Sequence, residues 1–301
     1  MTPSGIDDGL IASLRGLDRN GRLLFATRIL RMFGYGFLAV VLVLYLAAIG
    51  LEPGPIGLIL TLTLLGDTLI SLWLTTRADR IGRRLVLIAG SVLMVVAGVV
   101  FASTDVFVVL VVAGVIGVIS PTGNEVGPFL AVEQAALSQS IPDARRTPTF
   151  AWYNLVGYVA TAVGALVAGL LSQGFIGGGF DPADAYRTVV IGYALVGVVM
   201  AVLFRLVGPE IEAPERPSEA REAGRRLGLG PRSRGIVTRL SALFALDAFG
   251  GGFIPQSLMA SGSTCGSAWS RPSSEPSSSR RTCSRRCPRC RPPGSRRGSD
   301  W

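Results

Sequence analysis

The sequence contains no histidine and no lysine, so all 29 of its basic residues are arginines. Without an imidazole there is no histidine base, histidine metal ligand or histidine proton relay, which excludes Ser-His-Asp hydrolysis and histidine-zinc chemistry. Charge is also scarce, because 16% of the residues are charged, against about a quarter in a soluble globular domain. The composition therefore indicates neither enzyme chemistry nor a cofactor.

Long apolar runs replace the missing charge: 49% of the residues are hydrophobic and the mean hydropathy is +0.49. A helix needs about 20 mostly apolar residues to cross a bilayer, because lipid cannot hydrogen-bond an exposed backbone. Seven apolar blocks predict spans near residues 23–49, 55–76, 85–102, 106–139, 150–171, 189–207 and 236–259. The fourth block is long enough to predict a broken helix, and the third is short.

The arginines between these blocks predict the orientation. They gather before the first span and in the loops after the second, fourth and sixth spans. The loops 50–54 and 103–105 have none, and the loop 173–187 has only Arg187. Because arginine-rich loops stay in the cytoplasm, the N-terminus is predicted to be cytoplasmic, in the cell's inner (plasma) membrane.

The formal net charge of +9 belongs mostly to the C-terminal tail, since residues 260–301 hold nine arginines and two acids. The rest of the chain is close to balanced, so the charge does not argue for a nucleic-acid partner. All four cysteines also lie in the tail: Cys265, Cys283, Cys287 and Cys290. Their spacing fits a zinc site poorly, which leaves two interpretations, a disordered tail and a changed reading frame after residue 259. Read one base earlier, the degenerate codons permit apolar residues, so we expect the tail to be out of frame and the chain truncated.

The loop between the second and third spans reads Asp-Arg-Ile-Gly-Arg-Arg over residues 79–84. It resembles the cytoplasmic loop of major facilitator transporters, Gly-x-x-x-Asp-Arg-x-Gly-Arg-Arg, with Thr75 in place of the first glycine. The alternative is that its arginines are only topology signals. The resemblance covers roughly residues 22–259 and implies a cytoplasmic gate formed by Asp79, Arg80, Gly82, Arg83 and Arg84.

The same resemblance implies twelve spans in two related halves. Residues 30–37 and 246–253 agree at five of eight positions, as expected of an internal repeat, although glycine-rich and phenylalanine-rich membrane sequence can match by chance. The predicted fold is an all-α membrane protein: a six-helix half of a major facilitator fold, a seventh transmembrane helix and a disordered C-terminal tail. Its predicted parts are a cytoplasmic N-terminal segment, the bundle, a cytoplasmic linker, the seventh helix and the tail, at residues 1–21, 22–208, 209–235, 236–259 and 260–301.

Polar residues inside the apolar blocks are functional candidates, because an ionisable group at membrane depth is expensive. Asn124 and Glu125 lie in a stretch with two prolines and two glycines, typical of an interrupted helix that lines a cavity. The predicted cavity for solute and protons contains Arg31, Asp67, Asn124, Glu125, Asn154 and Asp247.

Several polar and aromatic residues of these blocks also have an interpretation that involves no functional role. Arg28 could extend to the headgroups, and Glu133 could lie hydrated at a helix end, on nearly the same face as Glu125. Asp67 could be a structural partner of an arginine. An aromatic belt at the membrane surface would explain Trp152 and Tyr153.

The resemblance implies a transporter that moves a small solute by alternating access and is coupled to protons. Two alternatives remain. One is a membrane subunit that binds a partner and moves no solute. The other is a membrane-embedded enzyme, which the absence of histidine disfavours.

Overall fold

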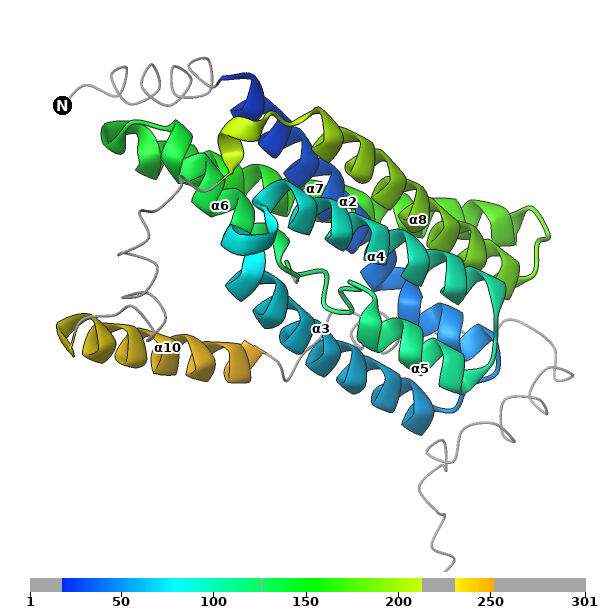
Figure 1. Cartoon of the computed structure of the whole chain (residues 1–301). Coiled ribbons are helices and arrows are strands. Elements are labelled where there is room, and N and C mark those ends of the chain that lie inside the picture. Colours follow the sequence, from blue (N-terminus) through cyan, green and yellow to red (C-terminus); the bar gives the residue numbers. More distant parts are fainter. Residues whose placement is uncertain (1–17, 126, 213–230, 252–301) are drawn as a thin grey trace, which may run out of the picture. The chain divides into compact units, whose positions relative to one another are not determined.

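The computed structural model describes residues 18–125, 127–212 and 231–251, and within them the chain is helical without a strand. This confirms the predicted all-α class. Five of the described helices, α2, α3, α4, α7 and α8, are long and apolar enough to cross a membrane. The elements are α2 (Arg19–Ala48), α3 (Pro53–Ile81), α4 (Arg83–Ser103), α5 (Phe107–Ile116), α6 (Phe129–Ser140), α7 (Asp143–Gly177), α8 (Pro182–Leu206), the short 3₁₀ helix η1 (Pro209–Ile211) and α10 (Pro231–Gly251), as Figure 1 shows.

Four predicted segments extend beyond the described residues: the N-terminal segment, the linker, the seventh span and the tail. The seventh span was expected over 236–259, and α10 covers its first part as a helix that ends at Gly251. The part after Gly251 and the whole tail 260–301 lie outside the described residues, as does most of the segment 1–21. The seventh span, the tail and the predicted domain boundaries therefore stay predictions.

The helices begin where their sequences favour it. Asp18 caps α2 by accepting a hydrogen bond from the Gly21 backbone N–H at 2.7 Å, and Asp181 caps α8 by accepting one from Ala183 at 2.9 Å. A capping carboxylate satisfies an N–H group that lacks a partner within the helix. Proline at the first position of α3 and of α8 needs no such partner. Local chemistry thus fixes where three of the helices start.

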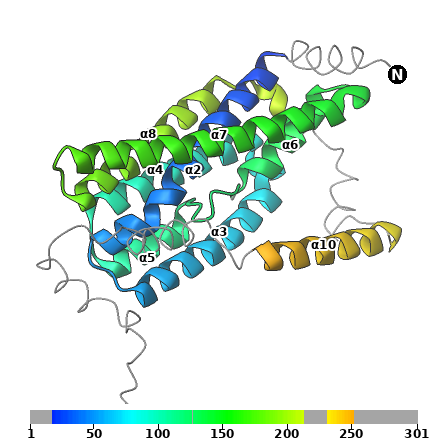
Figure 2. The same cartoon turned by 180° about the vertical axis from the view of Figure 1, so that it is seen from behind.

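Helix α2 packs against both α7 and α8, and α4 packs against α8. The contact between α2 and α7 is very close, because a Cβ atom on Gly36 would lie 2.0 Å from the Thr161 carbonyl oxygen. The partner helix offers the same feature, since a Cβ on Gly164 would lie 2.1 Å from the Phe33 carbonyl oxygen. Figure 2 shows α7 running alongside α2. These glycines let two backbones approach each other, as small residues commonly do in membrane bundles.

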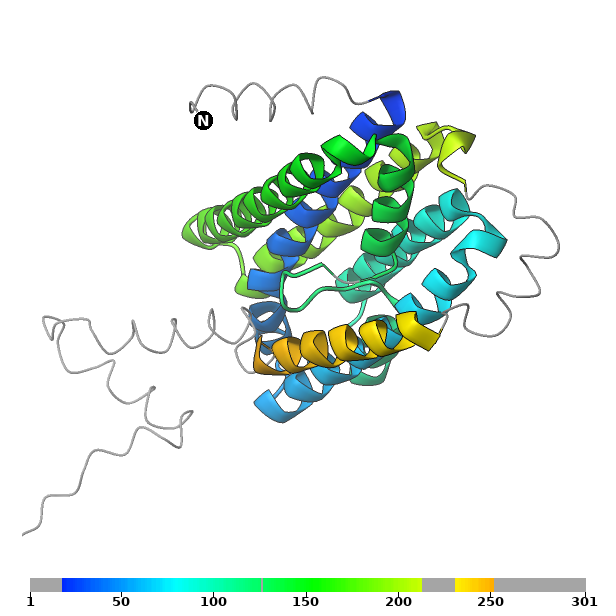
Figure 3. The ribbon, with the colours of Figure 1, turned by 90° about the vertical axis from the view of Figure 1, so that its left-hand side faces the viewer.

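The predicted fourth span is interrupted, as expected. Helix α5 ends at Ile116 and α6 begins at Phe129, and the segment between them is irregular. Figures 1 and 3 show it as a thin loop in the middle of the bundle. Gly123 and Gly127 have φ values of +69° and +92°, which side chains other than glycine rarely adopt. Irregular backbone at membrane depth is tolerated only where protein or water satisfies it, so this segment marks a special part of the bundle.

One end of the bundle, here called the Gly82 end, is where α2, α4 and α7 begin and where α3, α6 and α8 finish. Contacts between these ends hold it together: Asn20 Oδ1 accepts from the Gly208 backbone N–H at 3.0 Å, and Arg83 Nη1 donates to Gln139 Oε1 at 2.9 Å. At the opposite end, Arg187 pairs with Asp105 at 3.2 Å. Both ends are thus closed by polar contacts between segments far apart in the sequence.

Candidate functional site

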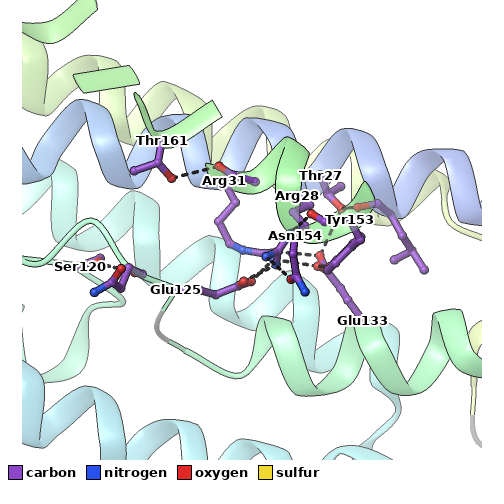
Figure 4. A network of polar contacts seen from close by, with 12 residues as sticks. Thr27, Arg28, Arg31, Ser120, Glu125, Glu133, Tyr153, Asn154 and Thr161 are labelled. Carbon is purple, nitrogen blue, oxygen red and sulfur yellow. Dashed lines mark hydrogen bonds and ion pairs between the residues drawn. The ribbon is translucent and has the colours of Figure 1, made fainter. Parts of the chain in front are cut away.

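Four charged side chains meet in the interior and form what we call the buried charge cluster: Arg28, Arg31, Glu125 and Glu133 (Figure 4). Helix α2 supplies the two arginines, which are three residues apart and therefore lie on one face of the helix. Glu133 belongs to α6, and Glu125 belongs to the irregular segment before it. The cluster joins α2 to the interrupted fourth span, which consists of α5, the irregular segment and α6.

Arg31 and Glu133 form the most buried pair of the cluster, with 0% of either side chain exposed. Arg31 Nη1 donates to Glu133 Oε1 at 2.6 Å, and Nη2 donates to Oε2 at 2.8 Å. The Tyr153 hydroxyl donates to the same carboxylate, and Thr27 Oγ1 lies 3.2 Å from it. Bidentate hydrogen bonds between an arginine and a carboxylate are strong and specific in geometry, so they fix the position of the Glu133 side chain.

Glu125 is held differently, because it bridges the two arginines with one oxygen on each. Arg28 has further partners: its Nε donates to the Tyr153 carbonyl oxygen at 2.7 Å and its Nη2 donates to Asn154 Oδ1 at 3.2 Å. Its guanidinium also lies 4.1 Å from the centre of the Tyr153 ring. Glu125 is therefore the acid of the cluster that lies on irregular backbone, and within the described residues its side chain has arginines as its only partners.

The cluster contains two positive and two negative charges and is formally neutral. Burial of an unpaired charge costs several kcal/mol, and a buried pair recovers this only with good geometry and further hydrogen bonds. The cluster supplies both. Ionisable groups at membrane depth, paired with one another, commonly mark the paths of solutes or ions.

Asp67 of α3 binds the irregular segment that carries Glu125 and is connected to the buried charge cluster in this way. Its Oδ2 accepts a hydrogen bond from the Gly127 backbone N–H at 3.2 Å, and its Oδ1 accepts one from Ser71 at 3.5 Å. No arginine is among these partners within the described chain. Asp67 thus anchors the backbone two residues after Glu125.

The structure brings Arg31, Glu125 and Asn154 of the predicted cavity together and places Asp67 next to them. Asn124 is different, because its side chain is exposed and its backbone carbonyl accepts a hydrogen bond from Ser120 at 2.6 Å. Asp247 lies on α10, with its side chain exposed. Three of the six predicted residues therefore share one site, and a fourth, Asp67, lies beside it.

The sequence alternatives for three neighbouring residues are wrong. Arg28 does not extend to the headgroups, because it is 4% exposed and bound to Glu125. Glu133 is not hydrated at a helix end, because it is fully buried. Tyr153 does not belong to a surface belt, because it is fully buried against the cluster. The spacing of three residues between the two arginines of α2, which puts them on one helical face, is a signal in the sequence that could have indicated a pair of buried cations.

The motif at residues 79–84 forms the sharp connection between α3 and α4. Gly82 has a φ value of +107°, which is open to glycine and strained for other residues. Asp79 Oδ1 pairs with Arg83 Nε at 3.1 Å, and Arg83 also donates to Gln139 and to the Ile211 carbonyl oxygen. The motif that resembles the family's cytoplasmic loop thus forms a turn at Gly82 and an ion pair between Asp79 and Arg83.

Glu212 is a residue of the Gly82 end that the sequence did not indicate. Its carboxylate accepts hydrogen bonds from the backbone N–H groups of Arg83 at 2.6 Å and Arg84 at 3.2 Å. It therefore caps α4, where the helix dipole favours a negative charge. Arg84 donates in turn to the carbonyl oxygens of Phe204 and Arg205 at the end of α8, whereas Arg80 is exposed. The predicted linker thus begins with residues that pack on the motif.

Next to this cap, Asn20 Nδ2 donates to Glu210 Oε2 at 2.8 Å. The pKa of the Glu210 carboxyl is lowered from its ordinary value, first by a hydrogen bond from its own backbone N–H and then by Asn20. The contact ties the start of α2 to the segment after α8. The acids of the segment 209–212 thus hold two other parts of the Gly82 end.

No group of three or more acids, histidines or cysteines that could hold a metal ion occurs within residues 18–125, 127–212 and 231–251. What these residues do provide is a neutral set of paired charges and a set of charged contacts at one end of the bundle. Such groups can exchange partners, bind a charged solute or pass a proton.

Comparisons with known proteins agree with this architecture. The Major Facilitator Superfamily matches residues 24–269. The chain is also similar to the "Uncharacterized membrane protein YJR124C" of Saccharomyces cerevisiae, with 31% identity over 80% of this chain and 60% of that protein. The chain thus spans about three fifths of the length of that relative. Because the family matches most of the sequence, this chain is a multi-pass membrane protein that belongs to the Major Facilitator Superfamily.

Proposed function

We propose that the protein supplies the first half of a secondary transporter that moves a small solute through the inner (plasma) membrane by alternating access, coupled to protons. The observation that carries this proposal is the buried charge cluster at the interrupted helix. A neutral group of four buried charges is costly to build and makes a poor device for stability alone. Beside an irregular segment, it fits a site that changes partners during transport.

Glu125 is the proposed proton carrier. Its protonation would remove one negative charge, and both arginines would lose their bridging partner at once. Glu133 would keep Arg31 in place through its two hydrogen bonds. The irregular segment, with its two glycines in unusual conformations, could then move without disturbing α6.

We further propose that the Gly82 end faces the cytoplasm and acts as a gate through Asp79, Arg80, Gly82, Arg83 and Arg84. The arginine distribution supports the orientation, and the contacts of Arg83 and Arg84 with other segments support the gate. Reporter fusions within 77–84 should report a cytoplasmic position, and fusions within 173–187 an external one. A fusion at 77–84 that reports from outside would contradict both ideas. Asp79→Asn should impair transport with little loss of membrane insertion.

Proton coupling is tested in vesicles that contain a form of the protein with both halves and a trapped pH-sensitive dye. Candidate solutes are added one by one, and a solute that is moved together with protons changes the internal pH. Glu125→Gln should abolish this signal while exchange of labelled solute continues. Glu52→Gln is the matched control, because Glu52 is an exposed acid at the start of α3 without a side-chain capping bond. An unchanged proton signal in Glu125→Gln would overturn the proposed coupling.

The second candidate is a membrane subunit that binds a partner and moves no solute. The chain's coverage of about three fifths of its relative keeps this candidate relevant. Binding of a partner by vesicles that show no flux for any solute would favour it. The changed reading frame after residue 259 is tested by the nucleotide sequence around codon 260, which should contain a second frame that encodes apolar spans.

A further inference from the structure

A small cavity at the Gly82 end lies on the outside of the bundle, between α4 and α8. Its volume is about 390 Å³, and its lining consists of Arg84, Leu85, Ile88 and Arg205. Two of these residues are positively charged and two are apolar. A cavity of this composition has the chemistry to bind an anion that is attached to an apolar chain.

The two arginines differ in how far they are already used. Arg84 is partly buried and donates to the carbonyl oxygens of Phe204 and Arg205. Within the described part of the chain, the exposed guanidinium of Arg205 has no hydrogen bond or ion pair to another residue. The acids near this end are engaged elsewhere, since Glu212 caps α4 and Glu210 accepts from Asn20. The positive charge of the cavity is therefore available to an outside partner.

Apolar surface continues from the cavity along both helices. On α4 the exposed side chains of Leu85, Val92, Val96 and Val99 recur every three to seven residues and so follow one helical face. On α8 a similar exposed set leads toward the cavity: Leu195, Val198, Val199, Val202 and Leu206. In a membrane protein, exposed apolar faces of this kind contact acyl chains.

We propose that this cavity binds the phosphate headgroup of an anionic phospholipid, whose acyl chains lie along the exposed faces of α4 and α8. The guanidinium groups of Arg205 and Arg84 bind the phosphate, and Leu85 and Ile88 contact the glycerol and the first methylene groups. Each arginine near a membrane surface contributes about 1 kcal/mol to attraction of an anionic lipid, which corresponds to about fivefold in affinity. Because Arg84 also belongs to the motif at residues 79–84, a bound lipid would stabilise the contact between that motif and the end of α8.

The test uses the purified 301-residue protein in a neutral detergent. Native mass spectrometry counts bound molecules of phosphatidylglycerol and of phosphatidylcholine with identical acyl chains. We expect phosphatidylglycerol to bind preferentially, and Arg205→Gln to weaken its binding about fivefold. Arg145→Gln is the matched control, because Arg145 is an exposed arginine of the same end outside the cavity, and it should retain the wild-type affinity.

Two further measurements decide the source of the anion and exclude a folding artefact. Inorganic phosphate at the same concentration should not displace phosphatidylglycerol, and full displacement would indicate a soluble-anion site instead. In the unmodified protein, rising salt should weaken the binding of phosphatidylglycerol, because the attraction is electrostatic. Equal binding of the two lipids, or an equal loss in Arg205→Gln and Arg145→Gln, would overturn the proposal.

Discussion

The protein uses arginine-carboxylate pairs in two places, and the two places differ in their access to water. In the buried charge cluster, Arg31 and Glu133 are fully enclosed. At the Gly82 end, Asp79 is 53% exposed and pairs across the turn between α3 and α4 with Arg83, whose side chain is 8% exposed. The same chemistry therefore has different consequences. In the interior, a lost partner leaves a charge that water cannot reach. At the Gly82 end, water reaches the Asp79 carboxylate, and the buried Arg83 keeps its hydrogen bonds to Gln139 and Ile211 when Asp79 is lost.

The largest effect is expected from Glu133→Gln. The amide can still accept hydrogen bonds, but the two arginines would share a single acid and leave a net positive charge in the interior. Breaking one side of a buried pair typically costs about 3–5 kcal/mol. Unfolding of the purified protein in detergent, followed by tryptophan fluorescence, measures this loss. Glu52→Gln serves as the control and should change little, and an equally small change in Glu133→Gln would remove the distinction between the two places.

A smaller effect is expected from Gly82→Ala. The positive φ value of Gly82 costs a side chain about 1–2 kcal/mol, although the turn itself lies at the surface. Gly54→Ala is a matched control, because Gly54 lies in the first turn of α3, and a Cβ there would meet nothing within 4 Å. The control should be neutral or slightly stabilising. Similar stabilities of the two variants would contradict the strained turn.

Glu212→Ala tests the cap of α4. Removal of the carboxylate leaves the N–H groups of Arg83 and Arg84 without their acceptor, which typically costs about 1 kcal/mol at a helix start. The same unfolding measurement detects it. Glu210→Ala should cost less, because Glu210 caps no helix and contacts Asn20 from an exposed position. If Glu210→Ala were the more damaging variant, the segment 209–212 would hold the Gly82 end through Asn20 instead.

The sequence predicted the features that depend on local chemistry. Apolar blocks of sufficient length predicted the five described helices that are long and apolar enough to cross a membrane, and the prolines and glycines around Asn124 predicted the break in the fourth block. Each of these signals lies within a few neighbouring residues, so tertiary structure was not needed to find them.

The ion pairs of the buried charge cluster could not be predicted, because they depend on which helices are neighbours. In the sequence, Arg28 could extend to the headgroups and Glu133 could lie hydrated at a helix end. Only the contacts of α2 with α6 and α7 show that both are buried. Tyr153 likewise had the alternative of an aromatic belt at the membrane surface, and only its tertiary contacts show that it is buried. Glu212 lies in a stretch rich in charge, proline and glycine, which gave no sign that it caps a helix more than a hundred residues earlier.

The contrast between the two places is tested most directly by two double-mutant cycles in the same protein. One cycle combines Arg31→Met with Glu133→Leu, and the other combines Arg83→Gln with Asp79→Asn. The account predicts a coupling free energy of about 2–3 kcal/mol for the fully buried pair and about 0.5 kcal/mol for the pair in which Asp79 is half exposed. It also predicts that the first double variant is more stable than Arg31→Met alone, because no buried charge is left without a partner at that position. Equal coupling energies in the two cycles would contradict the account.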